Sequence, residues 1–200
     1  MTELVRVDVF VEDRAHEDFL VALVRRLARE SKRQVRTVVR SSRGGQGRAI
    51  EEMVTVQRTI QHGFSGIPMP DVFVVGIDGN CKTSPVRRRE IEERCLAPFR
   101  DRIVVACPDP HVERWYMADP ASFLDVVGAT PRVGHTKCLR DHYVDLLAST
   151  VRAGGHPPTL GGIEFAADLV DAMDLLRAEK GHPDLAQFVR DFRHALAARE

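Results

Sequence analysis

Residues 71–77 read Asp-Val-Phe-Val-Val-Gly-Ile, an apolar run without alternating polar side chains. This pattern is typical of a strand that is covered on both faces, because neither face meets water. Nearer the N-terminus, Val5, Val7, Val9 and Val11 alternate with mostly polar residues, which is the period of a strand. The two stretches therefore predict a sheet whose central strand is buried on both sides.

The rest of the chain alternates helical and strand patterns. We expect further strands at 34–40 and 102–106, and helices over about 19–28, 48–61, 85–96 and 110–119. This order favours an α/β fold with a mainly parallel sheet of about four strands and helices on both faces. After Gly128 only helical patterns follow, at 137–151, 162–177 and 184–198. The sequence thus predicts an α/β core over 1–128 and a helical C-terminal extension over 129–200 that packs on the core.

Composition places the chain among globular proteins. Of its 200 residues, 44% are hydrophobic and 29% charged, and 29 basic side chains balance 29 acidic ones. No apolar run approaches the roughly 20 residues of a membrane span, and the charged N-terminal stretch argues against a secretory signal. Cys81, Cys95, Cys107 and Cys138 are scattered, with no CxxC pair. We therefore expect reduced thiols and a cytoplasmic location.

Basic side chains gather in two places. Residues 25–48 hold nine of them against a single acid, and residues 87–89 are three consecutive arginines. A face that binds nucleic-acid phosphates would explain both groups. The candidates for this face are Arg40, Arg43, Arg48, Arg87 and Arg88. A solvated helix face and loop explain the pattern equally well, because no aromatic residues interleave the bases.

Acidic residues follow three of the predicted strands. Glu12 ends the first strand, Asp78 and Asn80 follow the central one, and Glu113 comes shortly after the fourth. Ligands of open α/β sheets bind beyond the carboxyl ends of the strands. Glu12 and Asp78 would then lie within range of one ion, and Mg²⁺ prefers such oxygen ligands. The same acids also suit helix caps and turns, so both interpretations stay open.

Three motifs carry a family resemblance: VFVEDRAHEDFL (residues 9–20), VVGIDGN (74–80) and ACPDPHVERWYMAD (106–119). With them the chain resembles the TOPRIM fold, and most of all the small stand-alone bacterial TOPRIM-like proteins related to OLD-family nucleases. Some of those proteins occur beside ATPases in phage-defence loci. The matching residues are Glu12, Glu17, Phe19, Leu20, Asp78, Pro110, Glu113, Trp115, Ala118 and Asp119.

The resemblance implies a TOPRIM-like, Rossmannoid fold and metal-dependent cleavage of phosphodiester bonds with Mg²⁺ or Mn²⁺. Glu12, Asp78, Glu113 and Lys137 would be the catalytic residues. The ion would be held by Glu12, Asp78, Asn80 and Glu113. The implied partners are nucleic acid, DNA before RNA, and an ATPase, together with a second copy of the chain; no membrane is implied.

Three positions depart from the family pattern. Asp13 replaces the usual glycine, His16 stands where a second acid is common, and Asn80 replaces the second aspartate of Asp-x-Asp. An asparagine offers a carbonyl oxygen without charge, so we expect a weaker affinity for Mg²⁺. These departures support a second hypothesis: a degenerate, catalytically inactive TOPRIM module that binds a partner protein or nucleic acid without cutting it.

Other chemistry is less well supported. Cys107, His111, His135 and Cys138 supply the ligand types of a tetrahedral zinc site, but not the spacing of a standard finger or ribbon. No phosphate-binding G-x-x-x-x-G-K-[ST] loop is present, so we do not expect the chain to hydrolyse ATP. Trp115, the single tryptophan, is expected to anchor the core.

Overall fold

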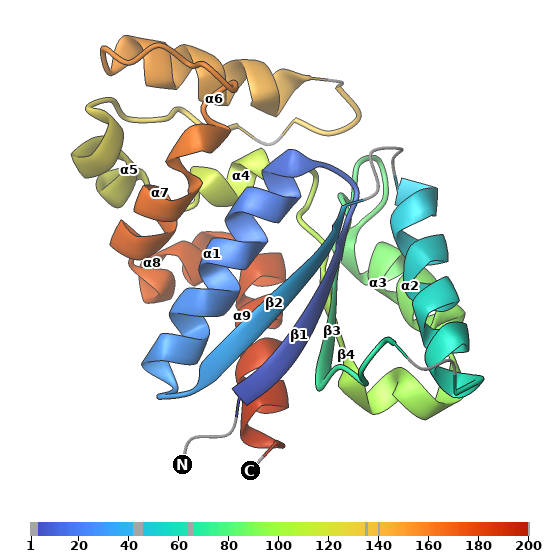
Figure 1. Cartoon of the computed structure of the whole chain (residues 1–200). Coiled ribbons are helices and arrows are strands. Elements are labelled where there is room, and N and C mark those ends of the chain that lie inside the picture. Colours follow the sequence, from blue (N-terminus) through green and yellow to red (C-terminus); the bar gives the residue numbers. More distant parts are fainter. Residues whose placement is uncertain (1–3, 42–45, 64–65, 135, 140, 200) are drawn as a thin grey trace.

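The computed structural model describes residues 4–41, 46–63, 66–134, 136–139 and 141–199. It confirms the α/β prediction: four strands form an all-parallel sheet in the order β2-β1-β3-β4 (Figure 1). The strands are β1 (Leu4–Val11), β2 (Gln34–Ser41), β3 (Val72–Gly76) and β4 (Ile103–Ala106). The two outer strands, β2 and β4, thus flank β1 and the buried β3.

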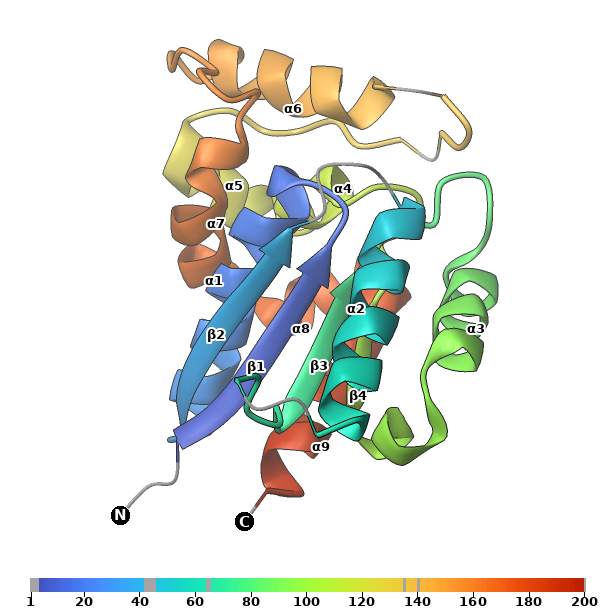
Figure 2. The ribbon, with the colours of Figure 1, turned by 45° about the vertical axis from the view of Figure 1, so that its right-hand side comes forward.

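Helices cover both faces of this sheet. They are α1 (Arg14–Glu30), α2 (Gln46–Gln61), α3 (Ser84–Arg94), α4 (Glu113–Tyr116), α5 (Pro120–Val127), α6 (His142–Ala153), α7 (Ala166–Ala172), α8 (Leu175–Gly181) and α9 (Pro183–Ala197), with short 3₁₀ helices at Ala97–Arg102 and Ile163–Phe165. Helices α1 and α9 lie on one face, and α2 and α3 lie on the other (Figure 2). No described helix has the length and apolar character needed to cross a membrane.

The side chains of β1 divide between two buried clusters. Val7 and Val9 pack toward α1 and α9, whereas Phe10 packs toward α2 and α3. In β3, Val74 joins the first cluster and Phe73 the second, and every residue of this strand is buried. Two covered faces explain why residues 71–77 lack a polar alternation.

Parallel pairing brings the ends of three strands to one level. Val11 of β1 is paired with Gly76 of β3, and Gly76 with Ala106 of β4. A Cβ atom on Gly76 would lie 2.4 Å from Leu20 Cδ1, so the close approach of α1 to the sheet requires a glycine. Helix α6 lies beyond this carboxyl edge, apart from the two helical layers (Figure 1).

Asp119 ties α5 to the helices that follow it. Its buried carboxylate accepts two hydrogen bonds from the Arg177 guanidinium, at 2.6 and 2.8 Å. Its Oδ2 also accepts from Ser122 Oγ at 2.6 Å and from the backbone N–H of Asp174 at 2.8 Å. The acid that ends the third family motif is therefore satisfied by structural contacts.

Trp115 is fully buried, as expected of a core anchor. It packs on Phe19 and Phe188, which belong to the two helices that cover this face of the sheet. Its Nε1–H donates to Asp184 Oδ2 at 2.7 Å, so the indole leaves no buried polar atom unsatisfied.

Several predicted helix bounds are wrong. The helix expected over 110–119 is reduced to α4, because the backbone N–H of Val112 is already held by Asp78 and the residue before Pro120 disfavours helix. Helix α5, which begins at Pro120, was not predicted. Helix α6 begins at His142 and not at 137, because the backbone φ of Cys138 and of Asp141 is positive, near 60°.

The helix expected over 162–177 is also wrong. Met173 and Asp174 adopt extended backbone and separate α7 from α8. The Asp174 side chain then caps α8 by accepting from the Arg177 N–H at 3.0 Å. Local capping therefore interrupts an apolar pattern that would otherwise continue as one helix.

We predict that Asp119→Asn lowers the free energy of unfolding at pH 7 by about 2–3 kcal/mol, because Arg177 loses a charged partner with two acceptors. The hydrogen bonds from Arg177 hold the pKa of Asp119 well below its usual range. A carboxyl with a lowered folded-state pKa stabilises the fold above its unfolded pKa and loses that contribution as the pH falls. The difference between wild type and variant should therefore shrink below about pH 4.

Urea unfolding at pH 7 and at pH 3 measures this difference. The matched control is Asp168→Asn, since Asp168 is exposed on α7, and it should change stability by less than about 0.5 kcal/mol. Equal stability of wild type and Asp119→Asn at pH 7 would contradict the structural role.

Candidate functional site

Glu12 and Asp78 meet at the carboxyl edge of the sheet. Glu12 follows β1 directly and Asp78 comes two residues after β3. The backbone N–H of Asp78 donates to Glu12 Oε1 at 2.8 Å, and both side chains are buried. Their proximity agrees with the parallel pairing expected from the sequence.

The Asp78 carboxylate is held from three directions. Its Oδ1 accepts from the backbone N–H of Val112 at 2.8 Å and lies 3.1 Å from His16 Nε2, and its Oδ2 lies 2.7 Å from His111 Nδ1. Burial tends to raise the pKa of Asp78, but the charge of His16 and the hydrogen bond from His111 outweigh burial and lower it. Asp78 is therefore an ionised carboxylate between two imidazoles.

His16 lies fully buried in the first turn of α1. Its Nδ1 is 2.8 Å from Asp13 Oδ1, the oxygen that also caps the helix by accepting the His16 backbone N–H at 2.9 Å. Its Nε2 faces the opposite way, 3.1 Å from Asp78 Oδ1 and 3.7 Å from Glu12 Oε1. Burial opposes the protonated form, but the charge of Asp78 and the bond to Asp13 raise the pKa of His16 well above its usual value.

The carboxyls of Glu12 and Glu113 lack enough nearby positive charge to stay fully ionised at neutral pH. Burial raises the pKa of Glu12 to about 7, with the nearby charge of Asp78 adding to the effect. Burial likewise raises the pKa of Glu113, in α4, to about 7. At neutral pH each of these groups is therefore divided between its protonated and ionised forms, so the protein itself does not fully compensate the acids gathered here.

A pocket of about 280 Å³ opens at this edge of the sheet, where Asp78 and Glu113 line it. One wall comes from the strand ends and α4, with Asp13, Asp78, Asn80, Cys81, His111 and Glu113. The other wall comes from Cys138, Leu139, Asp141, Tyr143 and Val144. The positive φ angles of Asn80, Cys138 and Asp141 lie between 53° and 61° in this lining, and such backbone gathers at functional sites.

The donor set fits a divalent cation. Glu12, Asp13 and His16 each offer one ligand atom, and the three atoms lie within 4.8 Å of one another. Among the described residues, the buried His16 Nε2 makes no hydrogen bond of acceptable geometry. Carboxylates with an imidazole are ligands of Mg²⁺, Mn²⁺ and Zn²⁺ sites, and a cation would supply the positive charge that Glu12 and Glu113 lack.

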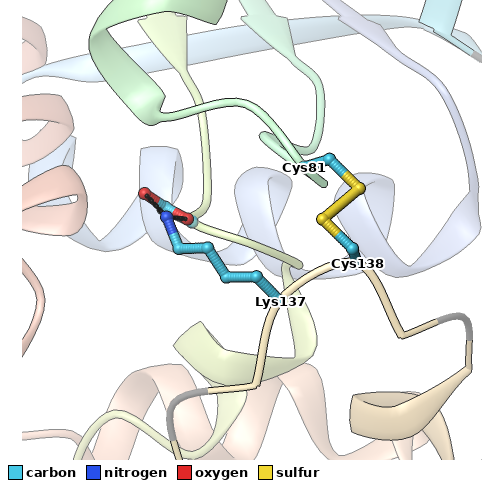
Figure 3. The surroundings of a disulfide bond; sticks show 4 residues. Cys81, Lys137 and Cys138 are labelled. Atoms are coloured by element: carbon cyan, nitrogen blue, oxygen red, sulfur yellow. Dashed lines mark hydrogen bonds and ion pairs between the residues drawn. A yellow bond between two sulfur atoms is a disulfide. The ribbon is translucent and has the colours of Figure 1, made fainter.

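Lys137, expected in the catalytic set, lies outside this cluster. Its Nζ is 2.7 Å from Asp109 Oδ1 (Figure 3), and the side chain is about half exposed. Arg114 is also occupied, because it donates to the Asp109 carbonyl oxygen at 2.7 Å and lies over the Tyr143 ring. The contacts described for both cations are therefore with Asp109 and Tyr143.

The expected phosphate-binding arginines have different surroundings. Arg40 lies 3.3 Å from the buried Asp8 carboxylate, and Arg43 falls outside the described residues. Arg87 pairs with Glu90, and Arg88 bridges Glu92 of its own helix and Asp191 of α9. Arg48 is exposed in the first turn of α2, at the edge of the sheet that carries Glu12.

The cysteines correct an expectation from the sequence. Cys81 and Cys138 are joined in a disulfide (Figure 3), so the prediction of four reduced thiols is wrong for this pair. Cys95 and Cys107 are free and buried. The hypothetical zinc set is not assembled either. Cys138 is bonded to Cys81, Cys107 lies in the core near α3, and His135 is outside the described residues.

Comparison with protein-family models, with curated proteins and with solved structures yields no match to this chain. The relationship to TOPRIM proteins therefore stays a prediction from the three motifs. The geometry adds residues that sequence reasoning did not place in the site: Asp13, His16, His111 and Tyr143. The available signal was the spacing of Asp13 and His16, because an aspartate that caps a helix lies beside the residue three positions later.

We predict that Glu113→Gln stabilises the metal-free protein at alkaline pH. A carboxyl whose folded-state pKa exceeds its unfolded value weakens the fold as the pH rises from about 4.5 to about 7. The variant should therefore gain about 1–3 kcal/mol in the free energy of unfolding over wild type at pH 8, and much less at pH 5.

Chemical unfolding in the presence of a chelator measures this gain. Glu93→Gln is the matched control, because Glu93 is exposed on α3 and should change nothing at either pH. A Glu113→Gln variant that is less stable than wild type at pH 8 would contradict the assignment of a buried carboxyl without a compensating charge.

Proposed function

We propose that the chain is a metal-dependent, TOPRIM-like nuclease that cleaves phosphodiester bonds, with a divalent cation, Mg²⁺ or Mn²⁺, at the edge of the sheet. One observation carries the proposal: parallel pairing of β1 and β3 puts Glu12 beside Asp78 at the carboxyl edge. His16 lies beside both, and Asp78 and the buried Glu113 line a pocket. The family motifs point to the same chemistry.

Geometry groups Glu12 with Asp13 and His16 as ligand atoms, and we add Glu113 because burial raises its pKa to about 7, as it does that of Glu12. Asp78 and Asn80 join them through the family motif, and both line the pocket. When bound, a divalent cation neutralises the charge of a phosphodiester and polarises its phosphorus–oxygen bonds.

The chain's own residues would orient the reacting groups. Asp78 holds the His111 ring through Nδ1, which turns the imidazole edge toward the pocket that Asp78 and Glu113 also line. Asp13 fixes the His16 ring in the same way from the other side. A carboxylate that holds an imidazole in one orientation is a recurrent device for keeping a proton or ligand atom in place.

The nucleic acid would approach over the N-terminal end of α2. Arg48 is exposed there, and helix N-termini attract phosphate groups. Arg87 and Arg88 would bind phosphate only by giving up their partners Glu90, Glu92 and Asp191. Within the proposal, DNA is the first substrate to test, RNA the second, and an ATPase the proposed protein partner.

The second hypothesis, an inactive module, also has a specific observation in its favour. His16 and His111 already bring imidazole groups to both oxygens of Asp78, which is where a metal would otherwise compensate the charge. Together with Asn80 in place of an aspartate, this arrangement suits a site that holds its fold without a metal. Metal binding therefore separates the two hypotheses.

We predict that Glu12→Gln lowers Mn²⁺-dependent cleavage of supercoiled plasmid DNA by at least about 100-fold, since an essential charge at the reacting centre is removed. Calorimetry with Mn²⁺ alone should show binding to wild type that weakens about tenfold or more in the variant. Glu12→Gln is preferred to Asp78→Ala, because Asp78 also holds the Val112 backbone.

Asp125→Asn should cleave at the wild-type rate, and thermal unfolding should show that Glu12→Gln is folded. Cleavage by Glu12→Gln at the wild-type rate would contradict the nuclease assignment. Absence of both Mn²⁺ binding and cleavage in wild type would favour the inactive module.

We also predict that Arg48→Ala makes the slope of log affinity for DNA against log salt shallower by about one. Each phosphate contact releases about one counterion on binding. Fluorescence anisotropy with a labelled duplex at several salt concentrations gives the slope of log affinity against log salt. Arg58→Ala, an exposed arginine in the last turn of the same helix, is the control. An unchanged slope for Arg48→Ala would remove Arg48 from the interface.

A further inference from the structure

The Cys81–Cys138 disulfide joins the two walls of the pocket. Cys81 lies three residues after Asp78 on one wall, and Cys138 lies on the other. Figure 3 shows the bond between them. The two Cα atoms are 4.8 Å apart, within the range that disulfides span. The bond therefore connects the loop that carries Asp78 to a segment 57 residues further along the chain.

Both cysteines of the pair are exposed, whereas the free thiols Cys95 and Cys107 are buried. Thiol–disulfide exchange requires an attacking thiolate to reach one of the two sulfurs. Exposed disulfides belong to the labile class that serves regulation or catalysis, and buried ones to the structural class. Accessibility thus favours reaction at this one pair of the chain's four cysteines.

The other described contacts of residues 136–139 are weak. The backbone N–H of Thr136 donates to Tyr143 Oη at 2.9 Å, and Lys137 pairs with Asp109 while 45% exposed. Exposed ion pairs contribute little to stability, and Leu139 is exposed rather than packed in the core. The positive φ of Cys138 adds backbone strain. The disulfide is therefore the main described restraint on this segment.

We propose that Cys81 and Cys138 form a redox-active site whose substrate is a protein dithiol, and that reduction of this site opens the pocket. A thiolate of the dithiol attacks one sulfur of the pair, so a mixed disulfide forms and the other cysteine leaves as a thiolate. The second thiol of the dithiol then displaces the first cysteine. Two electrons and two protons pass to Cys81 and Cys138, and the dithiol becomes a disulfide.

Once the bond is broken, residues 136–139 keep only the Thr136 hydrogen bond and the Lys137 ion pair among their described restraints. Cys138 and Leu139 then move away from Asp78 and Glu113, and the pocket becomes accessible to a phosphodiester. Control of catalysis by this movement rests on the proposed function, whereas the exchange reaction and the movement do not.

The first test maps the disulfide in the full chain. Protein is equilibrated with oxidised and reduced glutathione, its remaining thiols are alkylated, and peptides are analysed without reduction. We expect a cross-link between Cys81 and Cys138 that thioredoxin removes, with Cys95 and Cys107 alkylated only after denaturation. Separate glutathione adducts on Cys81 and Cys138, or free thiols at both, would overturn the proposal.

The second test measures amide hydrogen exchange at residues 136–139 in oxidised and reduced protein. Exchange should be at least tenfold faster after reduction. Cys138→Ser and Cys81→Ser should both exchange at the reduced rate under oxidising conditions, and Cys95→Ala should keep the slow rate. Equal exchange in oxidised and reduced wild type would overturn the opening of the pocket.

The third test compares Mn²⁺-dependent plasmid cleavage in the two states, with at least fivefold more cleavage expected after reduction. Equal, non-zero cleavage in both states would overturn control by the disulfide. Absence of cleavage in both states counts against the proposed nuclease alone, because the cross-link and the exchange rates test the redox site without it.

Discussion

Parallel pairing of β1 with β3 is the constraint on which the site depends. With Val11 opposite Gly76, Glu12 and Asp78 come to the same edge, and the Asp78 backbone N–H reaches Glu12. A slip of one residue would turn every side chain of β1 to the other face and exchange its valines with Asp8 and Phe10. The apolar residues that select the register therefore also position the acids, although they lie outside the pocket.

The charges at this edge are compensated in ways that compete with each other. His16 Nε2, which lies beside Glu12 and Asp78, can carry a proton or present a lone pair to a cation, but it cannot do both. A proton turns His16 into an internal counterion for the carboxylates, and the site then needs no metal. A cation instead requires neutral imidazole, with Asp13 holding Nδ1–H. The nuclease hypothesis therefore requires a bound cation beside Glu12 and Asp78, whereas the inactive module requires a protonated His16 at the same place.

The sequence predicted the sheet well, because valine alternation and the unbroken run at 71–77 depend only on which faces are buried. It also predicted the meeting of Glu12 and Asp78, which follows from strand order. It could not predict the role of His16 or the pairing of Cys81 with Cys138, because both depend on partners far away in the chain. The predicted bounds of the helix at 110–119 were wrong for a related reason. The backbone N–H of Val112 donates to Asp78, and no local sequence pattern indicates this contact.

The two walls of the pocket are held in place by different kinds of interaction. Asp78 is held by paired strands and buried hydrogen bonds, so it moves only if the core does. The facing residues 136–139 bury little apolar surface and depend on a few contacts, one of them covalent. Functional movement is drawn from the parts of a fold with low local stability, because opening them leaves the core intact. A rigid acidic edge that faces a segment whose main described restraint is a reducible bond therefore keeps its geometry while access to it changes.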